Sequence, residues 1–362
     1  MKVRINREVL KQAAAKSAKI IGKSIQPIME CLYLEIKEDK IYVSAISNDV
    51  TICTTAEGAV CDENFECLLT SDLFLSVLGK MKSEYVILEM DKKSKEPILQ
   101  LRGGSISMKI HCLDTALWNK AMPIKDPDLS VDTDFLLPAI AQCKHALDPK
   151  GDLPQKSSFC VHCKENEWKL TALDGFRISS RGSAPEDANE ILLPGHTLIL
   201  LESILETNVH LEIKGEVVCI KDSFTEVRLR TVAAKYFDLK STLNKPAEHY
   251  VKLKKADLVD VLELACVLFK SDDKERAVRL DINADTMTVI AKDKVANDMN
   301  SIIQVESDFD KPFSIGFNPS YLLDALKSIQ EDEIRLGIIN HITPLSIKGE
   351  SYMEMVLPVK IQ

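Results

Sequence analysis

The sequence predicts an α+β protein built from three copies of one domain. The main sign is a motif that occurs three times: an apolar strand end, a turn with a capping residue and a short amphipathic helix. Its copies begin at Leu69, Leu193 and Phe317, so each lies 124 residues after the one before (193 − 69 and 317 − 193). Solenoid and propeller repeats have periods of about 20–50 residues, so a repeat of this length is a whole domain.

Each predicted domain begins with a longer helix. The first runs from Arg7 to about Ile21 and has Asn6 as its N-cap. The corresponding helices are expected at 134–147 and 256–269. Alternating apolar and polar residues predict the strands of the first domain, at 2–5, 31–36, 41–45, 50–54, 65–69, 86–90, 98–101 and 106–111.

Two helices and about eight strands per domain imply that the helices cover one face of the sheets, because two helices are too few for both faces. Proline-containing linkers divide the chain into predicted domains at 1–122, 123–246 and 247–362. Three such domains in a row leave open sheet edges at both ends of the chain. A head-to-tail homo-oligomer would pair these edges, and it becomes a ring if the rotation closes.

Composition and charge limit the class of protein. The hydrophobic fraction of 45% and the charged fraction of 28% are typical of globular proteins, and the net charge is −9. The sequence has no apolar run long enough to span a membrane, and the polar first residues do not resemble a secretion signal, so we expect a cytoplasmic protein. The acidic balance argues against a tight grip on nucleic acid, although it permits a local basic surface.

Ten scattered cysteines are expected to be reduced residues of the core. The spacing of Cys160 and Cys163 suggests a metal site. However, the two residues should point to opposite faces of a strand, and no second Cys-x-x-Cys pair completes four ligands. We therefore expect no metal and no cofactor.

An enzyme is a weaker alternative. Asp49, Asp174 and Asp293 follow the second strand of each repeat, where carboxylates could hold magnesium for a metal-dependent reaction on nucleic acid. Equivalent positions in three repeats would lie in three separate domains, however, and the same residues are common in turns. The sequence lacks a glycine-rich phosphate loop and a nucleophile elbow, so no catalytic residue is expected.

Four stretches at matching order and spacing carry a family resemblance: 170–178, 276–280, 317–326 and 355–361. Over its full length the sequence resembles the bacterial sliding clamp family, the beta subunit of DNA polymerase III. The resemblance implies a homodimeric ring of six domains, with helices lining a central hole and sheets outside. Such a ring encircles double-stranded DNA regardless of sequence. It has no catalytic activity, and it tethers the replicative polymerase catalytic subunit, the clamp loader and other proteins with a clamp-binding motif, near the bacterial nucleoid.

DNA contact by a sliding ring needs only weak attraction to phosphates, which an acidic protein can supply locally. Spacings of i, i+3 and i+7 on the first helix predict a basic stripe, and the second helix adds Lys80 and Lys82 to it. The family resemblance implies DNA contact at Lys23 and at a loop of the second domain that contains Lys150 and Gln155. The third domain departs from this pattern, because acidic residues dominate its first helix. A ring-shaped scaffold that binds peptides but not DNA therefore stays open as an alternative. The expected DNA-binding residues are Lys16, Lys19, Lys23, Lys80, Lys82, Lys150 and Gln155.

A partner-peptide pocket between the second and third domains also follows from the resemblance. A short apolar anchor suits a concave apolar site with few polar groups. Phe176 stands where the family usually has His, and Asn244 stands where Pro is common. The expected pocket residues are Leu173, Gly175, Phe176, Arg177, Ile178, Leu243, Asn244, Asn318, Tyr321, Val356, Leu357, Pro358 and Val359. The expected dimer-interface residues are Ile106, Met108, Leu268 and Phe269.

Overall fold

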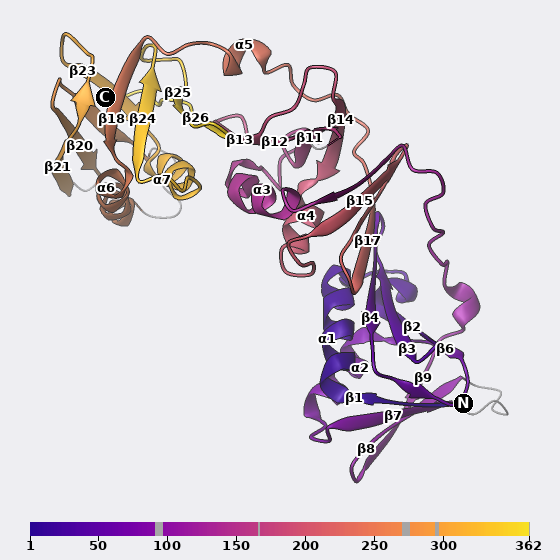
Figure 1. Cartoon of the computed structure of the whole chain (residues 1–362). Helices are drawn as coiled ribbons and strands as arrows, with labels where there is room; N and C mark the ends of the chain where they lie inside the picture. Colours follow the sequence, from indigo (N-terminus) through magenta and orange to yellow (C-terminus); the bar gives the residue numbers. More distant parts are fainter. Residues whose placement is uncertain (91–96, 166, 270–275, 294–296, 362) are drawn as a thin grey trace. The chain divides into compact units, whose positions relative to one another are not determined.

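The computed structural model describes residues 1–90, 97–165, 167–269, 276–293 and 297–361. Helices and antiparallel sheets alternate along the chain (Figure 1). Backbone contacts group the chain into two compact units: unit 1 is Met1–Asp134 with Leu200–Thr231, and unit 2 is Phe135–Ile199 with Val232–Gln362. Because the stretch 123–246 contributes to both units, the division into three domains stays a prediction.

Unit 1 contains two antiparallel sheets. The five-stranded sheet has the order β5 (Val60–Cys61), β1 (Lys2–Asn6), β7 (Tyr85–Met90), β8 (Ile98–Gly103) and β9 (Ile106–His111). The eight-stranded sheet has the order β10 (Leu129–Thr133), β15 (Val209–Lys214), β16 (Val217–Lys221), β17 (Thr225–Arg230), β4 (Val50–Ala56), β3 (Lys40–Ile46), β2 (Cys31–Lys37) and β6 (Phe65–Thr70).

The helices α1 (Arg7–Ser17) and α2 (Ser71–Lys80) pack against each other in unit 1. The side chain of Asn6 caps α1 as predicted, because its Oδ1 accepts the backbone N–H of Glu8 at 2.9 Å. Arg7 donates to the carbonyl of Leu78 at 3.1 Å, so the start of α1 lies beside the end of α2. Both helices bury apolar residues in the core of unit 1.

The first helix is shorter than predicted. It ends at Ser17, and a single 3₁₀ turn, Ala18–Ile20, follows it. Lys23 therefore lies beyond the helix in a segment without regular secondary structure, and the prediction of one helical stripe through Lys16, Lys19 and Lys23 is wrong for its last member.

Unit 2 also contains two antiparallel sheets. The nine-stranded sheet has the order β14 (Asn189–Pro194), β11 (Ser158–Lys164), β12 (Glu167–Leu173), β13 (Arg177–Gly182), β26 (Tyr352–Val356), β25 (Leu345–Lys348), β24 (Glu333–Ile338), β18 (His249–Lys254) and β22 (Glu306–Ser307). The four-stranded sheet has the order β21 (Asp298–Gln304), β20 (Thr286–Lys292), β19 (Val278–Ile282) and β23 (Phe313–Phe317).

The remaining helices are α3 (Leu136–Cys143), α4 (Gly195–Leu201), α5 (Lys240–Leu243), α6 (Lys255–Leu268) and α7 (Pro319–Lys327). The helix predicted at 134–147 is thus α3 followed by the 3₁₀ turn Lys144–Ala146. Pro138 is tolerated because it is the third residue of α3, within the first turn, where a backbone N–H has no helical partner. The helix predicted at 256–269 is α6.

The threefold strand–helix motif is confirmed. In each copy a strand runs directly into a helix: β6 into α2, β14 into α4, and β23 through the N-cap Asn318 into α7. In the first predicted domain, the short strand β5 was not expected from the sequence.

Two strand pairs join stretches that the sequence assigns to different domains. In unit 1, β17 pairs with β4, with Val227 opposite Ile52. In unit 2, β13 pairs with β26, with Ile178 opposite Met355. Each sheet therefore continues from one predicted domain into the next through backbone hydrogen bonds.

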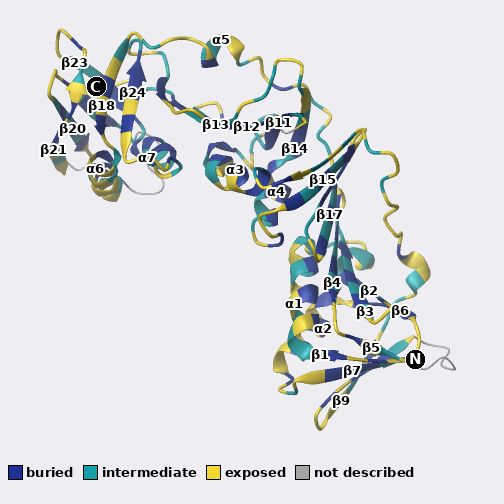
Figure 2. Ribbon diagram, viewed as in Figure 1, coloured by how far each residue is buried: buried dark blue, intermediate teal, exposed yellow. Residues whose placement is uncertain are grey.

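Burial follows this layout. In Figure 2 the buried positions gather on the inner strands and on the sheet-facing sides of the helices, while exposed positions mark the hairpin ends. Each core consists mainly of Leu, Ile and Val side chains. Among the described residues, no helix combines the length and the apolarity that a membrane crossing requires.

Candidate functional site

The turn between β12 and β13 is held by the carboxylate of Asp174. Its Oδ1 accepts the backbone N–H groups of Phe176 at 2.8 Å and Arg177 at 3.0 Å. Gly175 has φ of +98° and an added Cβ would come within 2.7 Å of Lys156 Nζ, so the position favours glycine. This turn aims the next two side chains toward α7.

Arg177 connects this turn to α7. Its Nε donates to Asp174 Oδ2 at 2.9 Å, and its Nη1 donates to Asp324 Oδ2 at 2.6 Å. The guanidinium also lies 4.4 Å from the centre of the Tyr321 ring. Phe176 contacts the same ring, with centroids 5.8 Å apart, and its side chain is 56% exposed. The result is an aromatic pair, with Phe176 exposed and Tyr321 half-buried, beside a well-fixed cation.

The segment after β26 passes along the same turn. The N–H of Leu357 donates to the carbonyl of Phe176 at 2.8 Å, and the N–H of Val359 donates to the carbonyl of Gly316 at 2.8 Å. Val356 is fully buried, whereas Leu357, Pro358 and Val359 are half-buried. We call Phe176, Arg177, Tyr321 and Leu357 the partner surface.

The other predicted pocket residues lie around the partner surface. Leu173 is buried at the end of β12, Ile178 is half-buried in β13, and Asn318 caps α7 by accepting the N–H of Ser320 at 3.0 Å. Leu243 is buried at the end of α5, and its carbonyl accepts Lys348 Nζ at 2.8 Å. Burial lowers the pKa of Lys348. Asn244 is exposed.

Two carboxylates at this surface were not among the predicted site residues. Asp174 was weighed as a turn residue and as a magnesium ligand but not as part of the pocket, although an Asp two residues before the exposed side chain is the usual signal of a side-chain-held turn. Asp324 has no comparable signal, because its bond to Arg177 depends on how α7 packs against β26, the strand paired with β13.

The predicted DNA-contact lysines of unit 1 form two groups rather than one. Lys80 and Lys82 are exposed at the end of α2, beside the start of α1. Lys19 and Lys23 are exposed, and Lys16 half-buried, at the far end of α1. The helix α1 is eleven residues long, which is about 16 Å. Lys19 Nζ also donates to the carbonyl of Ser203 at 2.9 Å.

In unit 2 the loop before β11 contains the two remaining candidates. Lys150 is exposed. The side-chain amide of Gln155, in contrast, donates to the carbonyl of Lys235 at 3.1 Å, so it serves a loop contact within the protein. On α6, Asp257, Asp260 and Glu263 are exposed, which agrees with the expectation that this helix is not a main phosphate contact.

Two sheets end in strands with apolar outward-facing residues. β9 is the last strand of the five-stranded sheet, and its Ile106 is 47% exposed. β21 is the last strand of the four-stranded sheet, and its Ile302 is 64% exposed. On α6, which packs against β21, Val267 is 80% exposed and Leu264 is also exposed.

The predicted interface residues differ in how accessible they are. Ile106 is exposed, and Met108 is half-buried against the core of unit 1. Leu268 is half-buried, while Phe269 is buried within the core of unit 2. The exposed apolar side chain at the end of α6 is thus Val267, which the sequence analysis did not select.

The acidic residues considered for an enzyme have turn roles. Asp174 holds the turn described above, and Asp293 accepts the N–H of Asn297 at 2.8 Å and its side-chain amide at 2.7 Å. Asp49 lies in the bend between β3 and β4.

Cys160 and Cys163 point to opposite faces of β11, as predicted: Cys160 joins a cluster with Leu173, Leu192 and Tyr236, which does not include Cys163. Burial raises the pKa of the Cys160 thiol, and it lowers the pKa of His162. The ten cysteines are all free thiols.

Comparison with known proteins identifies the family. Residues 1–116 match the DNA polymerase III beta subunit, N-terminal domain, and residues 240–359 match the C-terminal domain of the same subunit. The "Beta sliding clamp" of Mycoplasma capricolum is 23% identical, and that of Lactococcus lactis 20% identical, with 99% of each chain covered.

Solved structures show the same fold. A putative DNA polymerase III beta subunit from Eubacterium rectale is 22% identical and superposes with a TM-score of 0.90, covering 99% of both chains. The DNA polymerase sliding clamp of Bacillus subtilis is 20% identical, with a TM-score of 0.91 and full coverage of both chains. The chain therefore belongs to the DNA polymerase III beta subunit family and has the function of a sliding clamp, a processivity factor rather than an enzyme.

Proposed function

We propose that two copies of this chain join head to tail into a ring of six domains, which encircles duplex DNA and tethers the replicative polymerase. The proposed domains are 1–122, 123–246 and 247–362. The ring works in the cytoplasm, at the nucleoid.

The observation that carries this proposal is the pair of open sheet edges. β9 in unit 1 and β21 in unit 2 both end their sheets, and both expose an isoleucine. Unpaired edges with apolar side chains promote association with another chain. Pairing β9 of one copy with β21 of the other uses both edges and makes a contact that closes after two subunits. Val267 and Leu264 would then add apolar area to the interface beside Ile106.

Exposed lysines at the ends of α1 and α2 are the proposed DNA contacts, together with Lys150. A closed ring is held on DNA by topology, so a few weak contacts to phosphates are sufficient and a net charge of −9 is acceptable. Gln155 would contact DNA only after giving up its bond to the carbonyl of Lys235.

The partner surface is the proposed binding site for the short apolar segment of the polymerase catalytic subunit, the clamp loader and other clamp-binding proteins. The half-exposed Phe176 and the Tyr321 ring offer aromatic area. The guanidinium of Arg177, which Asp174 and Asp324 hold in place, offers a polar group that can orient the bound peptide. An apolar surface with one such polar group suits a small anchor peptide.

The test combines solution mass with retention on DNA. Light scattering over a dilution series should give twice the chain mass of 40.5 kDa, and a monomer at micromolar concentration would contradict the ring. After loading by a clamp loader, the protein should resist a high-salt wash on closed circular duplex and leave when the circle is cut. A stable dimer that circular DNA does not retain would instead identify a peptide-binding scaffold.

A further inference from the structure

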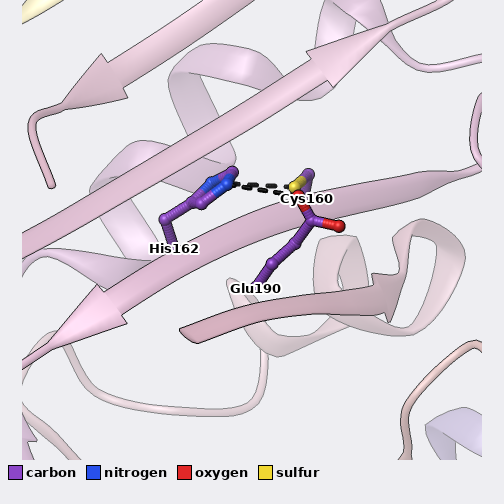
Figure 3. Close-up of side chains that lie close together, drawn as sticks. All are labelled: Cys160, His162 and Glu190. Carbon is purple, nitrogen blue, oxygen red and sulfur yellow. Dashed lines mark hydrogen bonds and ion pairs between the residues drawn. The ribbon is translucent and has the colours of Figure 1, made fainter. Parts of the chain in front are cut away.

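Cys160, His162 and Glu190 bring a sulfur, a nitrogen and an oxygen ligand together on one face of the nine-stranded sheet (Figure 3). One ligand atom from each residue lies within 4.8 Å of the other two. The Cys160 sulfur is 3.7 Å from His162 Nδ1, and the Glu190 carboxylate is 3.3 Å from His162 Nε2.

The backbone fixes this arrangement. Cys160 and His162 are two residues apart on β11, so their side chains share a face. Glu190 on β14 lies directly opposite His162 in the antiparallel pairing, where Cβ atoms are about 5 Å apart. The three groups therefore meet because of the strand register and need no flexible loop to bring them together.

The distances suit a metal ion. In a tetrahedral zinc site the bonds are about 2.0–2.3 Å, which places neighbouring ligand atoms roughly 3.4–3.6 Å apart. The sulfur already stands near this distance from His162 Nδ1. Only the Glu190 side chain, which is 40% exposed, has to turn from Nε2 toward the ion.

A second observation points to the same place. The hydroxyl of Tyr236 is buried and has no hydrogen-bond partner among the described residues, and its ring belongs to the same buried cluster as Cys160. The backbone N–H of Tyr236 approaches Glu190 Oε1 at 3.5 Å. An unpaired buried hydroxyl costs about 1–3 kcal/mol. A water bound to an ion at the neighbouring trio offers it a partner.

We propose that Cys160, His162 and Glu190 bind a zinc ion, with water as the fourth ligand. A mixed sulfur, nitrogen and oxygen set favours zinc over magnesium or calcium, which prefer oxygen ligands alone. His162 is 30% exposed, so the ion enters from solvent. Because β14 is the edge strand of its sheet, the ion clips that edge to β11.

Cobalt(II) titration of the chelator-treated full chain tests the proposal, since cobalt takes tetrahedral zinc sites and reports thiolate ligation by absorbance. The wild type should bind one equivalent with a thiolate-to-cobalt charge-transfer band that zinc abolishes. Cys160→Ser should lose this band. Glu190→Gln, at a half-exposed position that leaves the fold intact, should weaken binding about tenfold or more. Cys163→Ser is the matched control on the opposite face and should keep the band.

Zinc should also raise the unfolding temperature of the wild type and of Cys163→Ser, but not of Cys160→Ser, because the ion binds the folded chain. Three results would overturn the proposal: no saturable binding by the wild type, a charge-transfer band that persists in Cys160→Ser, or one that disappears in Cys163→Ser. Affinity unchanged by Glu190→Gln would likewise remove Glu190 from the ligand set.

Discussion

Arg181 and Glu354 form an ion pair of 2.6 Å in which both side chains are almost completely buried. Arg181 lies on β13 and Glu354 on β26, the two strands that continue the sheet from the second predicted domain into the third. The hydroxyls of Ser179 and Ser328 also donate to Glu354 Oε1, at 2.7 and 2.9 Å. The pair is thus fully hydrogen-bonded, which is the condition under which buried charges are tolerated.

Glu354→Ala should strongly destabilise unit 2, because it leaves the Arg181 charge buried without its partner. The expected loss is about 3–5 kcal/mol of unfolding free energy, measured as a lower midpoint in urea. Asp128→Ala removes one partner of the exposed pair with Lys214 and is the control that should leave the midpoint in place. Equal midpoints for the two variants would show that the buried pair of Arg181 and Glu354 does not stabilise unit 2 more than an exposed pair does.

Tyr321→Ala should weaken binding of partner peptides at least tenfold, which corresponds to about 1.4 kcal/mol, because the ring supports both Phe176 and Arg177. Fluorescence anisotropy with a labelled peptide that carries a clamp-binding segment measures the effect. Tyr250→Ala is a matched control, since Tyr250 also lies under a guanidinium, that of Arg335 at 4.3 Å. If both substitutions reduce affinity equally, the peptide does not use the partner surface.

Lys16→Glu with Lys23→Glu should weaken direct binding to linear duplex DNA while the dimer stays intact. The slope of log affinity against log salt should fall by roughly 1 for each phosphate that the protein no longer neutralises. Titrations at several salt concentrations give both quantities. Lys37→Glu, on the hairpin between β2 and β3, is the control. An unchanged salt slope in the double variant would remove the far end of α1 from the DNA site.

Val267→Glu should dissociate the dimer, because it places a charge in an apolar contact that two copies bury together. Light scattering should then give a mass near 40.5 kDa at concentrations at which the wild type is twice as heavy. Ile342→Glu tests a side chain of similar exposure (81%) away from β21 and should leave the mass unchanged. A dimeric Val267→Glu would place the interface elsewhere.

The repeated motif could be predicted from the sequence, because each copy combines a strand end, a cap and an amphipathic helix within a dozen residues. Predictions of where an element begins or ends were less reliable, because local preference and tertiary packing compete there. The helix after Arg7 has apolar periodicity beyond Ser17, yet the α-helix ends there and continues as the 3₁₀ turn Ala18–Ile20. At this point the hydroxyl of Ser17 donates to the carbonyl of Val43 at 2.7 Å. The strand β5 was missed, because two residues, Val60 and Cys61, are too few to show an alternating pattern.

Site residues were predictable only where local spacing or the family resemblance named them. The bond of Gln155 to Lys235 and the exposure of Val267 depend on packing between distant segments, so the sequence contains no direct sign of them. The trio of Cys160, His162 and Glu190 requires the register between β11 and β14, which local spacing does not reveal. The sequence analysis therefore weighed only Cys163 as a partner for Cys160.

The joints between predicted domains, β17 with β4 and β13 with β26, consist of backbone hydrogen bonds. Backbone groups are the same for nearly every residue type, so such a joint restricts side-chain identity mainly through burial and alternation. Substitutions can accumulate at these joints while the backbone pairing of the strands is kept. This explains how the chain can share only 20% of its residues with the Bacillus subtilis clamp and still superpose with a TM-score of 0.91. A fold that is held together by main-chain hydrogen bonds therefore tolerates wide divergence of its side chains.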